Sequence, residues 1–183
     1  MTMLLDSKQS ILVVVDVQAR LLPGVQDNDT LVKHCDWLVR LAQLAEVPVI
    51  GSEQYPQGLG HTEESLQARI GEANLYGKTT FSCIDDEGFA ARFEQEGRQQ
   101  VVLCGMESQA CVLQSALRLK ETGADVFVVA DAISARNHRD TEITLRRLEQ
   151  AGVTLVTREM VGFEWIRRSD APAFKTFSKD FLR

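Results

Sequence analysis

The sequence feature that most constrains the fold is a run of five aliphatic residues, ILVVV at 11–15, followed directly by Asp16. The run is continuously apolar instead of alternating, which is typical of a strand that is buried on both faces. Such strands occur almost only in parallel sheets that carry helices on both sides. The rest of the chain therefore has to supply further strands and the helices that cover them.

Strand patterns and amphipathic helix patterns alternate along the whole sequence. In the first helical pattern, Cys35, Leu38 and Ala42 recur at steps of three and four and form one apolar stripe. Gly97 follows a later helical pattern and is a plausible C′ residue. The expected strands are 11–16, 47–52, 76–82, 100–105, 125–131 and 153–157. The expected helices are 30–46, 63–71, 86–96, 109–122 and 138–151, with one or two surface helices in 158–183.

Six strands interleaved with helices predict an α/β fold with an open parallel sheet that is covered on both faces. The length of 183 residues suits one domain. The sequence contains no internal repeat, low-complexity stretch or linker. We therefore expect a single domain over residues 1–183.

Composition excludes several classes of function. The chain has 26 acidic and 20 basic residues and a net charge of −6, which disfavours nucleic acid as a partner. Its apolar runs are far shorter than the roughly 20 residues of a membrane span, and its start lacks the pattern of a signal peptide. Four irregularly spaced cysteines form no CxxC motif or disulfide framework. A soluble protein in a reducing, cytoplasmic compartment is therefore expected. The segment after the first strand lacks the glycine fingerprint of a dinucleotide-binding protein, which disfavours that function.

Three polar residues at expected strand ends or helix starts are candidates for chemistry, because ligands bind beyond the carboxyl ends of parallel strands. They are Asp16, Lys78 and Cys111. Each also has an ordinary interpretation: a loop-capping carboxylate, a surface lysine and a small core residue, respectively. The other three cysteines fit the core interpretation well.

Cys111 is the most suggestive of the three. The segment GMESQAC follows a strand and opens a helix, with Ser108 as the expected N-cap. Cys111 is then in the first turn, where unpaired N–H groups and the helix dipole favour the thiolate. Lys78 nearby favours the thiolate further, whereas Asp16 opposes it. On balance we expect a depressed pKa for the Cys111 thiol.

Three segments in order, VVVDVQ, GKTTFS and GMESQACV, resemble the isochorismatase-like hydrolase superfamily, also called cysteine hydrolases, from about residue 10 to 157. The segment SEQYPQGLGHT and the tail EWIRR…FK are similar to the isochorismatase-domain-containing proteins. The resemblance implies a three-layer α/β/α sandwich with a six-stranded parallel sheet. It also implies that Cys111 is the nucleophile, Asp16 its general base and Lys78 the electrostatic partner.

The resemblance implies further features of the site. It predicts a cis peptide between Met106 and Glu107, which would aim the Glu107 N–H, together with that of Cys111, at a developing oxyanion. From their places beside the three motifs, we expect four residues to form the wall of the substrate pocket: Gln18, Leu22, Tyr55 and Phe81.

The sequence departs from the metal-binding pattern of nicotinamidases in this superfamily. The pattern D-x-H-x5-H is replaced by Glu53, Tyr55 and His61 at the same spacing. Tyrosine is a rare metal ligand, and catalytic zinc sites usually keep three protein ligands. We therefore expect no metal and no other cofactor.

The leading hypothesis is a cysteine-dependent hydrolase that acts on the C–N bond of a small amide-like substrate. The alternative is a catalytically idle or regulatory member that works as an oligomeric interaction scaffold. A thiol redox protein, with Cys104 as the resolving partner of Cys111, is a third possibility. The resemblance also suggests a homo-oligomer, a dimer or tetramer.

Overall fold

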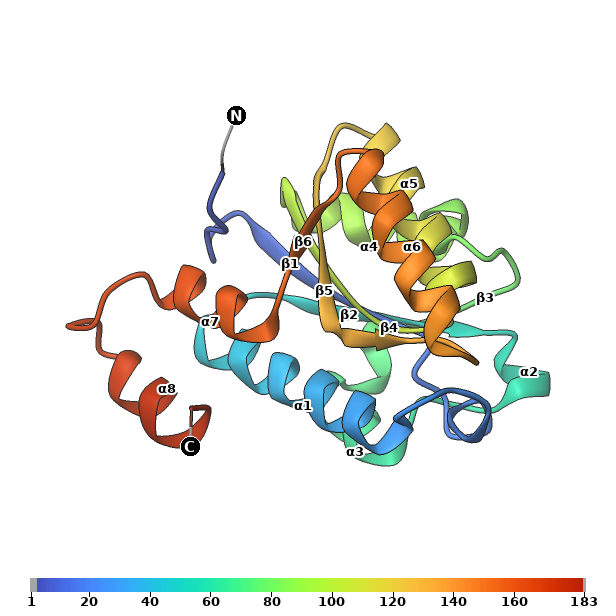
Figure 1. The fold of residues 1–183 in the computed structure, drawn as a ribbon, viewed down its shortest axis with the longest axis horizontal. Helices are drawn as coiled ribbons and strands as arrows, with labels where there is room; N and C mark the ends of the chain where they lie inside the picture. The colour runs from blue at the N-terminus through green and yellow to red at the C-terminus, as the bar shows by residue number, and fades with distance from the viewer. Residues whose placement is uncertain (1–2, 183) are drawn as a thin grey trace.

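A computed structural model describes residues 3–182 as a six-stranded, all-parallel sheet between two layers of helices (Figure 1). The strand order is β3-β2-β1-β4-β5-β6, so the expected α/β/α sandwich is confirmed. The strands are β1 (Ser10–Val15), β2 (Val49–Gln54), β3 (Leu75–Lys78), β4 (Gln100–Met106), β5 (Asp125–Ser134) and β6 (Thr154–Val156).

The central strand β1 is buried at all six positions, as its apolar run predicted. Val13 and Val15 belong to the hydrophobic core on one face of the sheet. Leu12 and Val14 belong to the core on the other face, as the alternation of side chains along a strand requires. The two cores together explain why residues 11–15 of this strand are all aliphatic.

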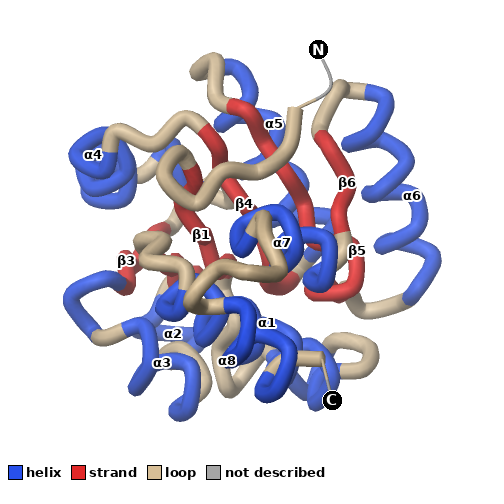
Figure 2. The backbone as a smooth tube through the Cα atoms, turned by 90° about the vertical axis from the view of Figure 1, so that its left-hand side faces the viewer, coloured by secondary structure: helices blue, strands red, loops and turns tan. Residues whose placement is uncertain are grey.

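The helices divide between the two faces of the sheet (Figures 1 and 2). One layer contains α1 (Asn28–Leu44), α3 (Glu64–Ile70), α7 (Arg158–Ile166) and α8 (Phe174–Asp180). The other contains α4 (Glu87–Glu96), α5 (Leu113–Glu121) and α6 (His138–Gln150), while the short α2 (Pro56–Leu59) follows β2. No helix within residues 3–182 combines the length and the apolar character that crossing a bilayer requires.

Most expected boundaries agree with the structure, and the differences have local causes. The third strand ends at Lys78 because the chain turns there toward the 3₁₀ helix at Cys83–Asp85. Strand β5 continues to Ser134. The β4–β5 register shifts between Leu103 and Gly105, and after this shift Met106 pairs with Ser134. The segment before α5 is a π-helix at Ser108–Val112 instead of the first turn of an α-helix.

The C-terminal helices dock on α1 through an aromatic cluster. The rings of Trp37 and Phe181 meet edge to face with centroids 5.3 Å apart, and Phe177 adds a second such contact at 6.3 Å. The Trp37 Nε1–H donates to the Phe181 carbonyl at 3.0 Å. The tail is therefore part of the folded domain.

Gly105 allows β1 and β4 to approach closely at the end of the sheet that holds the candidate site. It pairs with Val15 and has φ +125°, and a Cβ there would lie 2.2 Å from the Val15 carbonyl oxygen. We expect Gly105→Ala to lower the free energy of unfolding by about 3 kcal/mol or more.

The matched control is Gly97→Ala. Gly97 also has a positive φ, +59°, but a Cβ there meets nothing within 4 Å, so the loss should be about 1 kcal/mol. Urea unfolding of the two variants measures the difference. Equal losses would show that the close approach to Val15 does not limit stability.

Candidate active site

The strand order brings the carboxyl ends of β1, β2, β3 and β4 to one edge of the sheet. The chain leaves β1 for β2 and β3 on one side and returns to β4 on the other. In open α/β sheets such a switch in direction leaves a crevice beyond the strand ends where ligands bind. Asp16 follows β1, Gln54 ends β2, Lys78 ends β3 and Cys111 follows β4.

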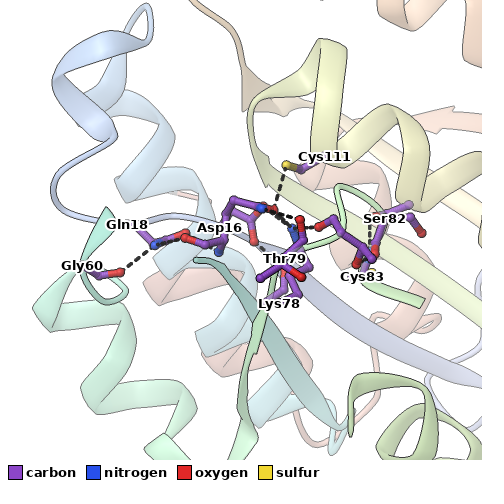
Figure 3. A network of polar contacts seen from close by, with 12 residues as sticks. Asp16, Gln18, Gly60, Lys78, Thr79, Ser82, Cys83 and Cys111 are labelled. Atoms are coloured by element: carbon purple, nitrogen blue, oxygen red, sulfur yellow. Dashed lines mark hydrogen bonds and ion pairs between the residues drawn. The ribbon is translucent and has the colours of Figure 1, made fainter. Parts of the chain in front are cut away.

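Asp16 and Lys78 form a buried ion pair at this edge. Lys78 Nζ lies 2.8 Å from Asp16 Oδ2, and the two side chains are 0 % and 1 % exposed (Figure 3). Lys78 also donates to Gln54 Oε1 at 2.6 Å and to the Thr80 carbonyl at 3.2 Å. The second carboxylate oxygen of Asp16 accepts from Ser52 Oγ at 2.7 Å. Both buried charges are thus paired and hydrogen-bonded, which is the condition for stable burial.

Gln54 links this ion pair to the thiol. Its Oε1 also accepts from Cys111 Sγ at 3.8 Å, and its Nε2 donates to the Thr79 carbonyl at 3.0 Å. The carbonyl acceptor at Thr79 fixes the amide orientation, so Oε1 faces both Lys78 and Cys111. Sequence reasoning missed Gln54 because it ended the second strand at residue 52. A strand two residues longer would have placed Gln54 at the same sheet edge as Asp16.

The expected depression of the Cys111 pKa is wrong. Burial of the thiol, which is 4 % exposed, raises its pKa well above the ordinary value; the Asp16 carboxylate raises it further, and Lys78 opposes the shift. Ser108 does not cap the helix, because its hydroxyl bonds to Thr141 Oγ1 at 3.1 Å. The thiol therefore lies near a helix start, as expected, but desolvation outweighs the favourable charges.

The expected cis peptide is also wrong. No peptide bond within the described residues is cis, and this includes the Met106–Glu107 bond. Instead, Glu107 has a left-handed conformation with φ +31° and ψ +80°, which turns the chain from β4 into the π-helix. The Glu107 carboxylate accepts from Gln109 Nε2 at 2.6 Å and from Arg136 Nε at 3.3 Å.

A cavity of about 340 Å³ opens over these groups. Four apolar residues form its walls, and charged or polar side chains form its floor and rim. The lining residues are Asp16, Leu21, Gln54, Leu59, Phe81, Glu107, Gln109, Ala110, Cys111 and Arg136. Phe81 is thus a wall residue, as expected.

The other three expected wall residues are not among the residues that line this cavity. Gln18 is buried and supports β2, because it accepts from the Gln54 N–H at 2.6 Å and donates to the Gln54 and Gly60 carbonyls. The Tyr55 ring packs over Gly58, and the residue is 52 % exposed. Leu22 begins the 3₁₀ helix Leu22–Gly24; both it and Leu21 pack on the core, and Leu21 is the one of the two that lines the cavity.

Glu53 and His61 lie together but in a different cavity. Glu53 Oε2 is 3.0 Å from His61 Nδ1, and Glu53 Oε1 accepts from the N–H and hydroxyl of Thr62 at 2.7 and 2.8 Å. Burial alone would raise the pKa of Glu53, but these hydrogen bonds outweigh it and leave that pKa lowered. Within residues 3–182 no three histidine, cysteine or acidic side chains form a metal-binding group. The pair acts as a contact that fastens the segment after α2 to β2.

The structure separates Cys104 from Cys111. Cys104 belongs to the core on the α1 side of the sheet, and Cys111 to the core on the α5 side. All four cysteines are free. The thiol redox interpretation thereby loses its expected resolving cysteine.

Comparisons with known proteins show the family and the fold. The family model of the isochorismatase domain matches residues 10–160. The chain belongs to the isochorismatase family. Isochorismatase domain-containing protein 2 of Danio rerio is 35 % identical over 175 residues, which cover 96 % of this chain and 88 % of the relative.

Two solved structures of this fold are similar over nearly the whole chain. The MAR1 ribonuclease of Caenorhabditis elegans has 32 % identity and a TM-score of 0.91, over 99 % of this chain and 93 % of that one. The YcaC gene product of Escherichia coli, an octameric hydrolase of unknown specificity, has 28 % identity and a TM-score of 0.91. The likeness covers 100 % of this chain and 93 % of that one. The family is thus one of isochorismatase-like hydrolases.

The raised pKa of Cys111 predicts how its alkylation depends on pH. Because a thiol reacts as its thiolate, the labelling rate should rise about tenfold per pH unit from 7 to 9 without a plateau. Asp16→Asn removes a charge that raises the pKa, so it should speed labelling at pH 8 by about tenfold. Lys78→Met should slow it. Mass spectrometry after timed iodoacetamide treatment measures each cysteine separately.

Two controls accompany this experiment. Asp85→Asn removes an exposed carboxylate that is paired with Arg118, and it should leave the labelling of Cys111 unchanged. Cys83, whose pKa burial raises to about 12, should stay unlabelled in the folded protein. A plateau near pH 7 in the rate for Cys111 would contradict the raised pKa.

Proposed function

We propose that this chain is a cysteine-dependent hydrolase that cleaves the C–N bond of a small amide-like substrate. Cys111 is the nucleophile, Asp16 the general base and Lys78 the electrostatic partner. The observation that carries the proposal is the convergence of these three side chains, from three separate strand ends, beneath one cavity. Membership of a hydrolase family supports the reaction class.

The raised pKa of the thiol decides how the nucleophile is activated. Cys111 rests as a neutral thiol, so a base has to take its proton as the sulfur attacks the carbonyl carbon. Asp16 fills this role because its carboxylate lies beside the thiol in the same buried network. Lys78 remains bound to Asp16 throughout and balances its charge.

The reaction then proceeds through two displacements. The C–N bond of the tetrahedral intermediate breaks, and the leaving nitrogen takes the proton held by Asp16, which leaves a thioester on Cys111. Water attacks the thioester while Asp16 accepts one of its protons; the C–S bond then breaks, which releases the carboxylic acid, and the Cys111 sulfur takes the proton back from Asp16. The backbone N–H groups of Glu107 and Cys111 are our candidates for stabilising the oxyanion, since both residues line the cavity near the start of α5.

The comparisons also bear on the substrate and on the oligomeric state. A ribonuclease activity, as named for the nematode relative, suits this chain less well, because its net charge is −6 and two carboxylates line the cavity. The octameric state of the Escherichia coli relative supports a homo-oligomer here as well. A cytoplasmic location stays a prediction from the free thiols.

A screen of small amides with wild type and Cys111→Ala side by side tests the proposal. For any amide that is cleaved, Cys111→Ala should lower kcat by about 10³-fold or more, as loss of a covalent nucleophile does. Asp16→Asn should also abolish turnover while leaving the thiol reactive. Ammonia or amine release measures the rate.

The matched control is Cys35→Ala, which removes a buried thiol on the opposite face of the sheet and should keep wild-type kcat. Turnover that survives Cys111→Ala would contradict the proposal. A chain that cleaves no amide but assembles into a defined oligomer would instead support the scaffold interpretation.

A further inference from the structure

Arg136 lies at the rim of the cavity and plays no part in the proposed chemistry. It follows β5 directly after Ala135, and its side chain is 72 % exposed. Within the described residues its only side-chain acceptor is Glu107, which its Nε reaches at 3.3 Å. The two terminal nitrogens of the guanidinium therefore keep their donors available at the cavity.

The backbone holds Arg136 firmly in this place. Gln26, in the loop before α1, donates from its Nε2 to the Arg136 carbonyl at 2.9 Å. The Gln26 N–H donates to the Ala135 carbonyl at 2.8 Å, and Ser134 Oγ donates to the Gln26 carbonyl at 2.5 Å. Three hydrogen bonds thus fix the main chain from which the Arg136 side chain reaches the rim of the cavity.

The remaining charges of the cavity are already balanced. Asp16 is paired with Lys78, and both oxygens of Glu107 accept hydrogen bonds, one from Gln109 and one from Arg136. Among the charged groups of the described lining, the unused hydrogen-bonding capacity is therefore that of the Arg136 guanidinium; the neutral Gln109 Oε1 also lacks a partner. A guanidinium presents two parallel N–H groups that match a carboxylate.

The Glu107 contact does not compete strongly with such a ligand. An ion pair at 3.3 Å whose arginine is mostly exposed is weak, because water and salt screen it. It involves Nε, so the guanidinium can keep this contact while its terminal nitrogens bind a second carboxylate. Glu107, which is 13 % exposed, then serves to orient the guanidinium.

We propose that Arg136 binds a carboxylate of the substrate, so that the amide cleaved by Cys111 carries a free carboxylate at its other end. This proposal deepens the proposed hydrolase function and rests on it for the reacting group. Apolar walls formed by Leu21, Leu59 and Phe81 suit a short carbon chain between the two polar ends. The volume of about 340 Å³ is at the small end of the range for ligand cavities.

A pair of alkylating reagents that differ in charge tests this assignment at the thiol itself. The Cys111 sulfur displaces iodide from iodoacetate or from iodoacetamide and forms the same S–CH₂ bond, so the two rates differ through the carboxylate. The measured quantity is the rate with iodoacetate divided by the rate with iodoacetamide. This ratio is normalised to the same ratio for N-acetylcysteine at equal pH and ionic strength. We expect the normalised ratio to be about ten and to fall in 0.5 M NaCl.

Arg136→Gln should lower the ratio about tenfold while the rate with iodoacetamide stays within about twofold of wild type. Arg136→Lys should keep part of the preference, since the charge remains but the paired donors are lost. Arg139→Gln is the matched control: it removes the same charge three residues further on, at an exposed position outside the cavity lining, and should leave the ratio unchanged. An unchanged ratio in Arg136→Gln, or an equal fall of both rates, would overturn the proposal.

A binding measurement separates this inference from the catalytic one. Calorimetric titration of Cys111→Ala protein with succinamate and with neutral succinamide needs no nucleophile. Succinamate should bind about tenfold more tightly, and Arg136→Gln in the same background should remove the difference. A preference for succinamate in Cys111→Ala, together with no amide cleavage by the wild-type protein, would support the carboxylate site and overturn the hydrolase. Equal binding of the two compounds, or binding of neither, would overturn the carboxylate site.

Discussion

Lys78 and Asp16 come from strands that are not neighbours, because β2 lies between β3 and β1, and their ion pair spans that gap. The intervening strand takes part through Ser52, which donates to Asp16, and Gln54, which accepts from Lys78. Removing one partner of such a buried pair leaves an uncompensated charge, at a cost of about 3–5 kcal/mol. The same pair fixes the base beside the thiol, so the stability of this sheet edge and the geometry of the proposed chemistry depend on one interaction.

The carboxyl ends of three adjacent strands share an unusual backbone feature. Asp16, Tyr55 and Glu107 each follow directly after a strand and each have a positive φ, although none is glycine. Left-handed conformations at such residues cost about 1–3 kcal/mol and cluster at functional sites. Here each one turns the chain sharply at the sheet edge, and two of the three place their residue in the lining of the cavity.

The fold could be predicted from the sequence because it depends on local pattern, and the apolar run before Asp16 indicated the central strand. The roles of Asp16, Lys78 and Cys111 came from the resemblance of their three motifs to a known family, and they stay predictions. What failed depended on burial and on side-chain direction, which spacing does not report. The pKa of Cys111 is raised because desolvation outweighs the helix start, and Tyr55 leaves the cavity because its ring packs over Gly58. Gln54 lay within the segment SEQYPQGLGHT without being assigned a role, and Arg136 lay outside the motifs, so the contacts of these residues in the structure were needed to find them.

The contacts of the C-terminal helices determine the order in which this protein can finish folding on the ribosome. Trp165 of α7 donates to the Ser10 hydroxyl in the central strand at 3.0 Å. The Leu5 N–H, in the segment before that strand, donates to Glu164 of α7 at 2.6 Å. Trp37 of α1 donates to the Phe181 carbonyl. These partners are separated by more than 140 residues along the chain. One apolar face of the sheet therefore lacks its full cover until residue 181 has been synthesised. During that interval the nascent chain presents the kind of exposed apolar surface that chaperones bind.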